Sequence, residues 1–130
     1  MKKYFAVGVG GAAGTVARHL IQLIPLPVGS VYRPLLTMLI NISGSFILGF
    51  IMILFIKLLP VTAEIRLGIT TGFLGGYTTF STLCKDSVLL YLSGHVFFSA
   101  AYVAGSVLLG LAAAWLGILS AKRLERRHAS

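Results

Sequence analysis

The residues that could do chemistry are concentrated in one stretch, which reads GFLGGYTTFSTLCKD from Gly72 to Asp86. It lies inside the third of four apolar segments, where two adjacent glycines and several hydroxyl side chains interrupt the run. A helix broken within a membrane leaves peptide groups without water, so the break must be buried in protein or line a wet cavity. The sequence therefore predicts an ion site at this break.

The predicted break offers ligands for either sign of charge. Unwound carbonyls in the range 75–79 suit a small cation, as the ends of half-helices do in transporters. Phe80 adds a ring whose edge is electropositive and weakly favours an anion, although packing is the usual role of a single Phe. Hydroxyl groups come from Thr78, Thr79, Ser81 and Thr82.

Further hydrogen-bond donors lie in the second and fourth apolar segments. Asn41 stands in the middle of LINISGSFILG, where its amide either joins two helices, a bond of about 1 kcal/mol or less, or faces a pore. Tyr102 and Ser106 are four residues apart and therefore share one helix face. A row of donors suits an anion, because a cation would require carboxylates or carbonyls.

Charged side chains within apolar segments are expensive and usually functional. Arg18 lies deep in the first segment, where it either extends to the interface or pairs inside the bundle. Lys85 and Asp86 follow the predicted break, and adjacent residues point to different faces of a helix. We therefore expect Asp86 to brace the broken helix and Lys85 to face a vestibule.

The composition predicts an all-α membrane protein. The 130 residues are 57% hydrophobic and 11% charged, whereas soluble domains carry about 25% charged residues. A membrane-crossing helix needs about 20 apolar residues. We expect a single domain, 1–130, with an uncleaved first helix in place of a signal peptide. The four predicted spans are Tyr4–Ile24, Leu35–Leu59, Arg66–Tyr91 and Val96–Ser120.

The basic residues predict an orientation, because cytoplasmic loops are enriched in Lys and Arg. Eight cations lie on the side of the membrane that carries both termini, whereas Arg33 is the clear loop cation on the opposite side. Both termini are therefore predicted to be cytoplasmic if the orientation is fixed. The formal net charge of +8 does not indicate nucleic-acid binding, since no aromatic residues are interleaved with the cations. The cations on the side of the termini are Lys2, Lys3, Lys57, Arg66, Lys122, Arg123, Arg126 and Arg127.

Small residues predict how the helices pack. The first segment contains Gly10-x-x-x-Gly14, and similar small residues occur in the second and fourth segments. They let backbones approach closely in lipid, where packing drives helix association. Four short helices enclose little volume, so an oligomer is expected.

Three features together resemble one known family. They are the run GFLGGYTTFST, the pattern Asn41-x-x-Gly44-x-Phe46, and the glycine-rich first helix that ends in Arg18. The combination closely resembles the Fluc/CrcB family of bacterial fluoride channels over nearly the whole chain. The resemblance implies a passive, fluoride-selective channel of the bacterial plasma membrane that exports cytoplasmic fluoride and protects against its toxicity. It also implies an antiparallel, dual-topology-type dimer with two narrow fluoride pathways.

The same resemblance implies roles for individual residues. A structural Na⁺ at the dimer centre would be held by the backbone carbonyls of Gly75 and Thr78. The residues that the resemblance places along or near the fluoride pathway are Asn41, Thr79, Phe80, Thr82, Tyr102 and Ser106.

Departures from the family pattern bear on the partner. The family usually continues as TTFSTF, whereas Leu83 stands here in place of the second Phe, which calls equal conduction through both pathways into question. Asp86 stands where a Glu is frequent, and Lys85 beside it is unexpected. Leu83 and the strongly asymmetric loop charges together indicate a fixed-orientation chain whose inverted second subunit is a paralogue. The alternative is an identical second subunit, in a homodimer whose orientation is decided by something other than loop charges.

Other functions fit the sequence less well. A small four-helix multidrug or metabolite exporter is the alternative, but it predicts a carboxylate in the first helix, and none is present. A non-conducting assembly subunit would require Leu83 and Lys85 to have disabled the pore. Enzymatic activity is not expected, because His19, His95 and His128 are scattered and no Ser or Cys has a plausible base.

Overall fold

A computed structural model describes residues 1–25 and 32–129, and every regular element within these ranges is a helix. The predicted all-helical fold is confirmed. The final helix continues to Ala129, beyond the predicted end of the last span at Ser120. The elements in chain order are α1 (Lys2–Gln22), α2 (Arg33–Lys57), α3 (Ala63–Leu67), the π-helix η1 (Gly68–Phe73), α4 (Leu74–Tyr77), α5 (Phe80–Leu92) and α6 (Val96–Ala129).

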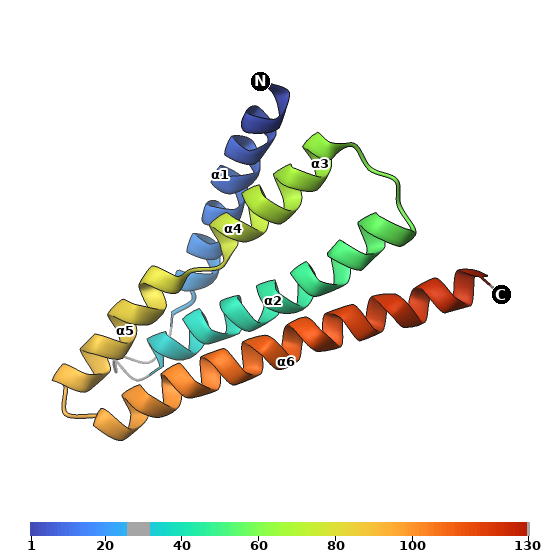
Figure 1. Ribbon diagram of the computed structural model, residues 1–130. Helices are drawn as coiled ribbons and strands as arrows, with labels where there is room; N and C mark the ends of the chain where they lie inside the picture. Colours follow the sequence, from blue (N-terminus) through green and yellow to red (C-terminus); the bar gives the residue numbers. More distant parts are fainter. Residues whose placement is uncertain (26–31, 130) are drawn as a thin grey trace.

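Figure 1 shows two groups of neighbouring helices. In one group α1 lies against α3, η1 and α4, and in the other α2 and α6 lie side by side along most of their lengths. α5 continues from α4 and contacts both α2 and α6, so it joins the two groups. Both termini lie at the end of the molecule that also carries the connection from α2 to α3.

Glycines determine the close approach of α1 to η1 and α4. A Cβ atom at Gly10 would collide with the carbonyl oxygen of Gly68, and one at Gly14 would collide with that of Phe73. From the opposite side, a Cβ atom at Gly72 would lie 2.7 Å from the carbonyl oxygen of Val7. No larger residue fits at these positions unless the backbones separate. The predicted packing role of the Gly10–Gly14 pair is thus confirmed.

α2 and α6 also approach each other closely at glycines. A Cβ atom at Gly49 would meet the carbonyl oxygen of Ala114, and one at Gly117 would meet that of Phe46. These contacts pack α6 against α2, so that one buried face of α6, the buried stripe, lies inside the bundle. Tyr102, Ser106 and Ala113 belong to this stripe.

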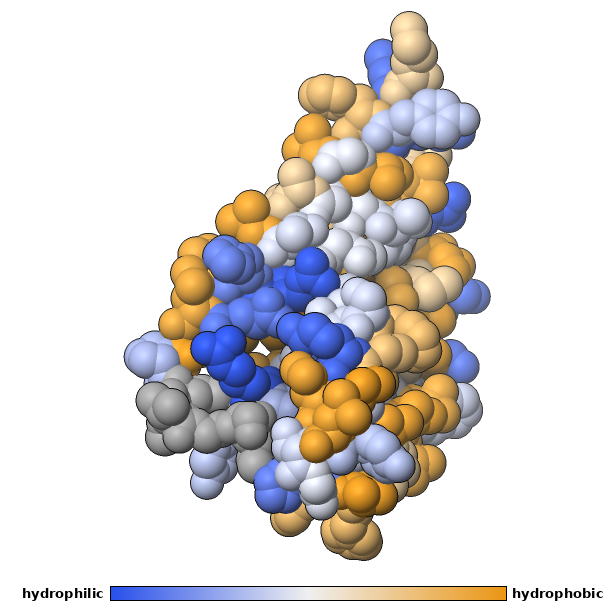
Figure 2. All heavy atoms as spheres, turned by 90° about the vertical axis from the view of Figure 1, so that its left-hand side faces the viewer, coloured by the Kyte–Doolittle hydropathy of each residue, from blue (hydrophilic) through white to orange (hydrophobic). Residues whose placement is uncertain are grey.

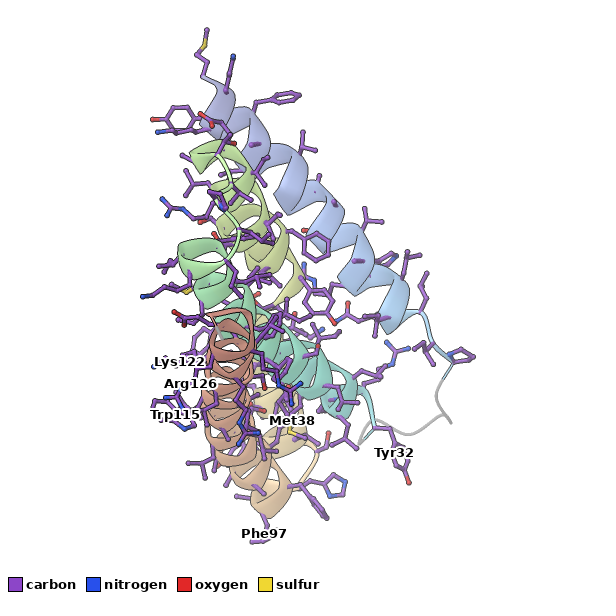
Figure 3. The ribbon with its side chains drawn as sticks, turned by 90° about the vertical axis from the view of Figure 1, so that its right-hand side faces the viewer. Tyr32, Met38, Phe97, Trp115, Lys122 and Arg126 are labelled. Atoms are coloured by element: carbon purple, nitrogen blue, oxygen red, sulfur yellow. The ribbon has the colours of Figure 1, made fainter. Side chains whose placement is uncertain are left out.

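The exterior of the bundle is largely apolar. Among the described residues, α2 and the range Val96–Arg127 are long and apolar enough to cross a membrane, and 17% of the most apolar stretch of each is buried. The core helix of a soluble protein would be mostly buried instead. Figure 3 shows Phe97 and Trp115 pointing away from the bundle. Figure 2 shows hydrophilic side chains gathered in one region of the face to the left in Figure 1, with apolar side chains around it. This surface agrees with a membrane protein.

Candidate functional site

The helical backbone is interrupted at two threonines. Thr78 has φ −77° and ψ 156°, and Thr79 has φ −150° and ψ 119°, so both residues are extended between α4 and α5. Gly75 and Gly76, which the sequence suggested as part of the unwound segment, remain in α4. Gly76 stays helical where it packs on α1, because a Cβ atom there would collide with the carbonyl oxygen of Gly11. The interruption is thus a short segment, called here the Thr78–Thr79 linker.

The side-chain amide of Asn41 binds both peptide groups of Thr79. Its Nδ2 donates to the carbonyl oxygen of Thr79 at 3.0 Å, and its Oδ1 accepts the backbone N–H of Thr79 at 2.7 Å. The amide therefore replaces the hydrogen bonds that the extended backbone no longer forms within a helix. Asn41 is a brace for the linker in this structure, with one N–H of its amide left to donate elsewhere.

Two backbone carbonyls lose their usual partners at the linker. In a continuous α-helix Gly75 C=O would accept the N–H of Thr79, and Thr78 C=O would accept that of Thr82. Here the N–H of Thr79 donates to Asn41 Oδ1, and the N–H of Thr82 donates to Thr79 Oγ1 at 3.2 Å. The carbonyls of Gly75 and Thr78 are those predicted to hold a cation. Peptide oxygens suit a small hard cation, so the residues present fit such a site.

An open groove of about 320 Å³ runs along the linker. Phe80 stands at its edge with 78% of its surface exposed, so the ring is not part of the core of this chain. A Cβ atom at Gly75 would meet nothing within 4 Å, so the chain itself leaves this position open. The lining residues are Asn41, Gly44, Ser45, Leu48, Thr70, Leu74, Gly75, Thr78, Thr79 and Phe80.

The hydroxyls of Thr79 and Thr82 are engaged with one another. Thr79 Oγ1 caps α5 by accepting the N–H of Thr82, and it donates to Thr82 Oγ1 at 3.0 Å. Ser81 Oγ lies 3.3 Å from the same oxygen. Such a cap satisfies one of the free N–H groups at a helix start. The two threonines therefore stabilise the start of α5, and their predicted place near an ion pathway stays a prediction.

Tyr102 and Ser106 form a second polar group on α6. Both side chains are buried, and neither hydroxyl oxygen has a hydrogen-bond partner among the described residues. Tyr102 packs with Leu83, Leu90 and Met38 in an apolar cluster. A buried hydroxyl without a partner costs free energy unless a ligand or water satisfies it. The structure thus contains two buried hydroxyls without a hydrogen bond on one face of α6, and Thr37 and Asp86 lie near that of Tyr102.

Asp86 has a partner that the sequence analysis missed. The buried Thr37 donates its hydroxyl to Asp86 Oδ2 at 2.9 Å, and Lys85 Nζ lies 3.9 Å from Asp86 Oδ1. Asp86 therefore braces α5 against α2, and Lys85 extends to the surface. Thr37 precedes Asn41 by four residues and so shares its helix face, which is the signal that could have identified it.

Arg18 is separate from these groups. It lies in α1 and is partly buried, and it has no hydrogen bond or ion pair with other residues of the described ranges. The structure thus brings Asn41, Gly75, Thr78, Thr79 and Phe80 together at the groove. Tyr102 and Ser106 lie on α6, and α2 contacts both groups.

Comparison with known proteins identifies the family. Residues 5–118 match the family described as "CrcB-like protein, Camphor Resistance (CrcB)". A Chlorobaculum tepidum protein named "Fluoride-specific ion channel FluC" is 43% identical over 94% of this chain and 96% of that protein. A Halalkalibacterium halodurans protein named "Fluoride-specific ion channel FluC 2" is 42% identical over 98% and 92%, respectively.

A third relative matches over its whole length. The Geobacter sulfurreducens protein named "Fluoride-specific ion channel FluC" is 38% identical over 95% of this chain and 100% of that protein. Together with the family match, these similarities confirm the resemblance drawn from the linker, Asn41 and the glycine-rich first helix. The chain belongs to the CrcB family.

Proposed function

We propose that this chain is a subunit of a passive, fluoride-selective ion channel that exports cytoplasmic fluoride. The observation that carries the proposal is the pair of buried, unpartnered hydroxyls of Tyr102 and Ser106. Close relatives with the channel name cover nearly the whole chain, which supports the same conclusion. The chain would protect the cell because fluoride enters as the neutral acid, is trapped as the anion, and leaves down its electrochemical gradient.

The chemistry of fluoride explains why such donors are needed. Fluoride holds its water more tightly than other halides, so a selective pathway must replace that water with hydrogen-bond donors and ring edges. Hydrogen bonds to a charged group are worth about 1.5–3 kcal/mol each, more than those between neutral groups. In the proposed pathway Tyr102 and Ser106 donate hydroxyls, Asn41 donates its remaining N–H, and Phe80 presents its ring edge. Thr79 and Thr82 stabilise the adjoining start of α5.

We further propose that the channel is an antiparallel dimer in the bacterial plasma membrane. The segment 63–92 would then be the third membrane span, interrupted at the Thr78–Thr79 linker. The open groove beside the linker, the exposed Phe80 ring and the open position at Gly75 favour this arrangement, because an inverted second subunit would cover all three. Peptide groups of the linker would otherwise face lipid, which is costly.

Such a dimer would bring two copies of the linker together around a structural Na⁺. The carbonyls of Gly75 and Thr78 would hold the ion, because Asn41 and Thr79 take the N–H groups that these carbonyls would otherwise accept. The cation would supply positive charge at the dimer centre. Asn41 and the cap of α5 would keep the carbonyl oxygens in place.

The second subunit is proposed to be either identical or a paralogue. Two of the relatives bear the name FluC 2. In this chain Leu83 is buried beside Tyr102, so the position lacks a ring that could line the pathway. The basic residues at the end with both termini favour one orientation, with the termini cytoplasmic.

The test is fluoride efflux from proteoliposomes that contain this chain alone, with chloride efflux as the control. A passive channel should release fluoride with or without a proton gradient. A proton-coupled exporter, the alternative function, would lose transport when a protonophore collapses that gradient. Efflux only after a paralogue is added would support the paired assembly, and efflux from this chain alone would remove the need for a paralogue.

A further inference from the structure

α6 extends beyond the thickness of a membrane. Its 34 residues span about 51 Å at about 1.5 Å per residue, whereas the hydrocarbon core is about 30 Å thick. The end of the helix is held in place: Ala121 is fully buried, and Glu125 Oε1 lies 3.8 Å from Lys57 Nζ at the end of α2. The helix therefore continues as a packed element into the region of the lipid headgroups.

One face of α6 changes character along its length. At 100° per residue, the residues of this face fall within an arc of about 60°, opposite the buried stripe that contains Tyr102 and Ser106. Two exposed leucines come first, an exposed tryptophan follows, and two exposed basic residues come last. Figure 3 shows the labelled tryptophan and basic residues together on one side of the helix. This face, called here the α6 outer strip, consists of Leu108, Leu111, Trp115, Lys122 and Arg126.

The order of these residues matches the order of chemical groups in a phospholipid. Exposed leucines suit acyl chains, and tryptophan is enriched at the level where chains meet headgroups. Lys122 lies about 10 Å beyond Trp115, at the depth where phosphate groups lie. Basic residues directly beyond a membrane helix attract anionic lipids.

We propose that the α6 outer strip binds an anionic phospholipid, with Lys122 and Arg126 at its phosphate and Trp115 at its glycerol region. This surface is separate from the linker and from the Tyr102–Ser106 pair, so the inference goes beyond the proposed channel function. Basic residues that only set the orientation of the chain would need no fixed position on the helix. The strip, by contrast, has Trp115 and both cations on one face.

The test measures the preference of the purified protein for spin-labelled phosphatidylglycerol over spin-labelled phosphatidylcholine in vesicles of phosphatidylcholine. The double variant Lys122→Gln/Arg126→Gln should lower the preference about fivefold for each charge removed at low salt. The matched control is Arg123→Gln/Arg127→Gln, which removes the same charge from the same turns but outside the strip. The control should keep most of the preference.

Three outcomes would overturn the proposal. Equal loss in both double variants would mean that diffuse charge attracts the lipid, with no strip involved. An unchanged preference in Lys122→Gln/Arg126→Gln would leave these residues a role in orientation only. Circular dichroism checks that each variant is folded. Inorganic phosphate should compete no better than chloride at equal ionic strength, and stronger competition would indicate a free-phosphate site in place of a lipid.

Discussion

Asn41 shows how one side chain can hold an irregular backbone in place. It contacts the N–H and the carbonyl of a residue 38 positions away, and both peptide groups are thereby satisfied without water. A buried peptide group without a partner costs about 1–3 kcal/mol. The same amide lies in the groove with Phe80, so one residue both fixes the linker and faces the proposed pathway.

Replacing Asn41 by Asp should impair both stability and transport. The Asp side chain can accept the N–H of Thr79 but cannot donate to its carbonyl, so the exchange should cost about 1–3 kcal/mol. The added negative charge should also block an anion. The unfolding midpoint in detergent and fluoride efflux are the measurements. An Asn41→Asp protein with the original midpoint and efflux would place Asn41 outside the pathway and make its contacts dispensable.

Phe80→Ile should slow fluoride efflux without loss of stability. Ring-specific contacts contribute about 0.5–1.5 kcal/mol, which corresponds to about a two- to tenfold change in rate. Since 78% of Phe80 is exposed, the fold of the chain does not depend on it. Phe97→Ile is the matched control, because Phe97 is 80% exposed and points away from the bundle near the start of α6. Equal efflux in both variants would mean that Phe80 has only a packing role.

Removing either of the two unsatisfied hydroxyls should lower fluoride efflux without lowering the stability of the protein. Ser106→Ala and Tyr102→Phe should leave the unfolding midpoint unchanged or raise it, because neither hydroxyl has a partner in the described part of the chain. Fluoride efflux should fall about tenfold in each variant, because the loss of one hydrogen bond to a charged group removes about 1.5 kcal/mol. Ser120→Ala is the control on the same helix, since Ser120 Oγ donates to the carbonyl of Leu116 and is exposed. Reduced stability with normal efflux would contradict a role in the pathway.

At the scale of the helices, backbone contacts between glycines position the site. α1 packs against η1 and α4 so closely that the position of the linker relative to α1 depends on Gly14 and Gly76. η1 is π-helical, and π-helices occur frequently near functional sites. The widened turn is separated from the linker by the short helix α4 and changes the faces that the following residues present.

Gly14→Ala should destabilise the bundle by about 1–3 kcal/mol, the usual cost of overpacking, because the new methyl group would collide with the backbone of Phe73. Gly8→Ala on the same helix is the control, since nothing lies within 4 Å of a Cβ atom there. The control should be neutral or slightly stabilising, because Ala favours a helix over Gly. The unfolding midpoint of each purified variant in detergent is the measurement. Equal midpoints would mean that α1 separates from η1 at little cost.

The sequence was sufficient for the helical class and the close packing, because both depend on local patterns. Apolar runs predict helices, and Gly10-x-x-x-Gly14 predicts a close contact wherever the partner lies. The position of the linker was less accurate: local propensity favours Gly75 and Gly76, yet α1 holds Gly76 in helical form. The contacts of Asn41 with Thr79 and of Thr37 with Asp86 join segments far apart in the sequence. The spacing of Thr37 and Asn41 places both on one helix face, but no local pattern reveals their partners.

At the scale of the molecule, charge and apolar surface are both distributed unevenly. Eight of the eleven lysines and arginines lie at the end that carries the termini. The apolar exterior needs lipid or another subunit to cover it, and the open groove is where the proposed second subunit would lie. Orientation and assembly are therefore properties of the whole surface and cannot be assigned to single residues.

The chain should insert in one orientation, with its C-terminus in the cytoplasm. Reporters fused after Ser130 that are active on only one side of the membrane give the measurement. Replacing Lys122, Arg123, Arg126 and Arg127 together by Gln should increase the fraction inserted the other way, because these cations lie within about 15–20 residues of the last span. Equal cytoplasmic and external signals from the unchanged chain would contradict a fixed orientation.

The brace on the linker has a consequence for the order of assembly. Asn41 and Thr79 belong to the same chain, so the bend is already shaped in a lone protomer. In the proposed dimer, two protomers would then meet with their contact surfaces already formed, without folding on contact, and we expect their encounter within the bilayer to limit the rate of assembly. A sodium ion arriving at that junction would lock the pair together and would have no part in making the bend.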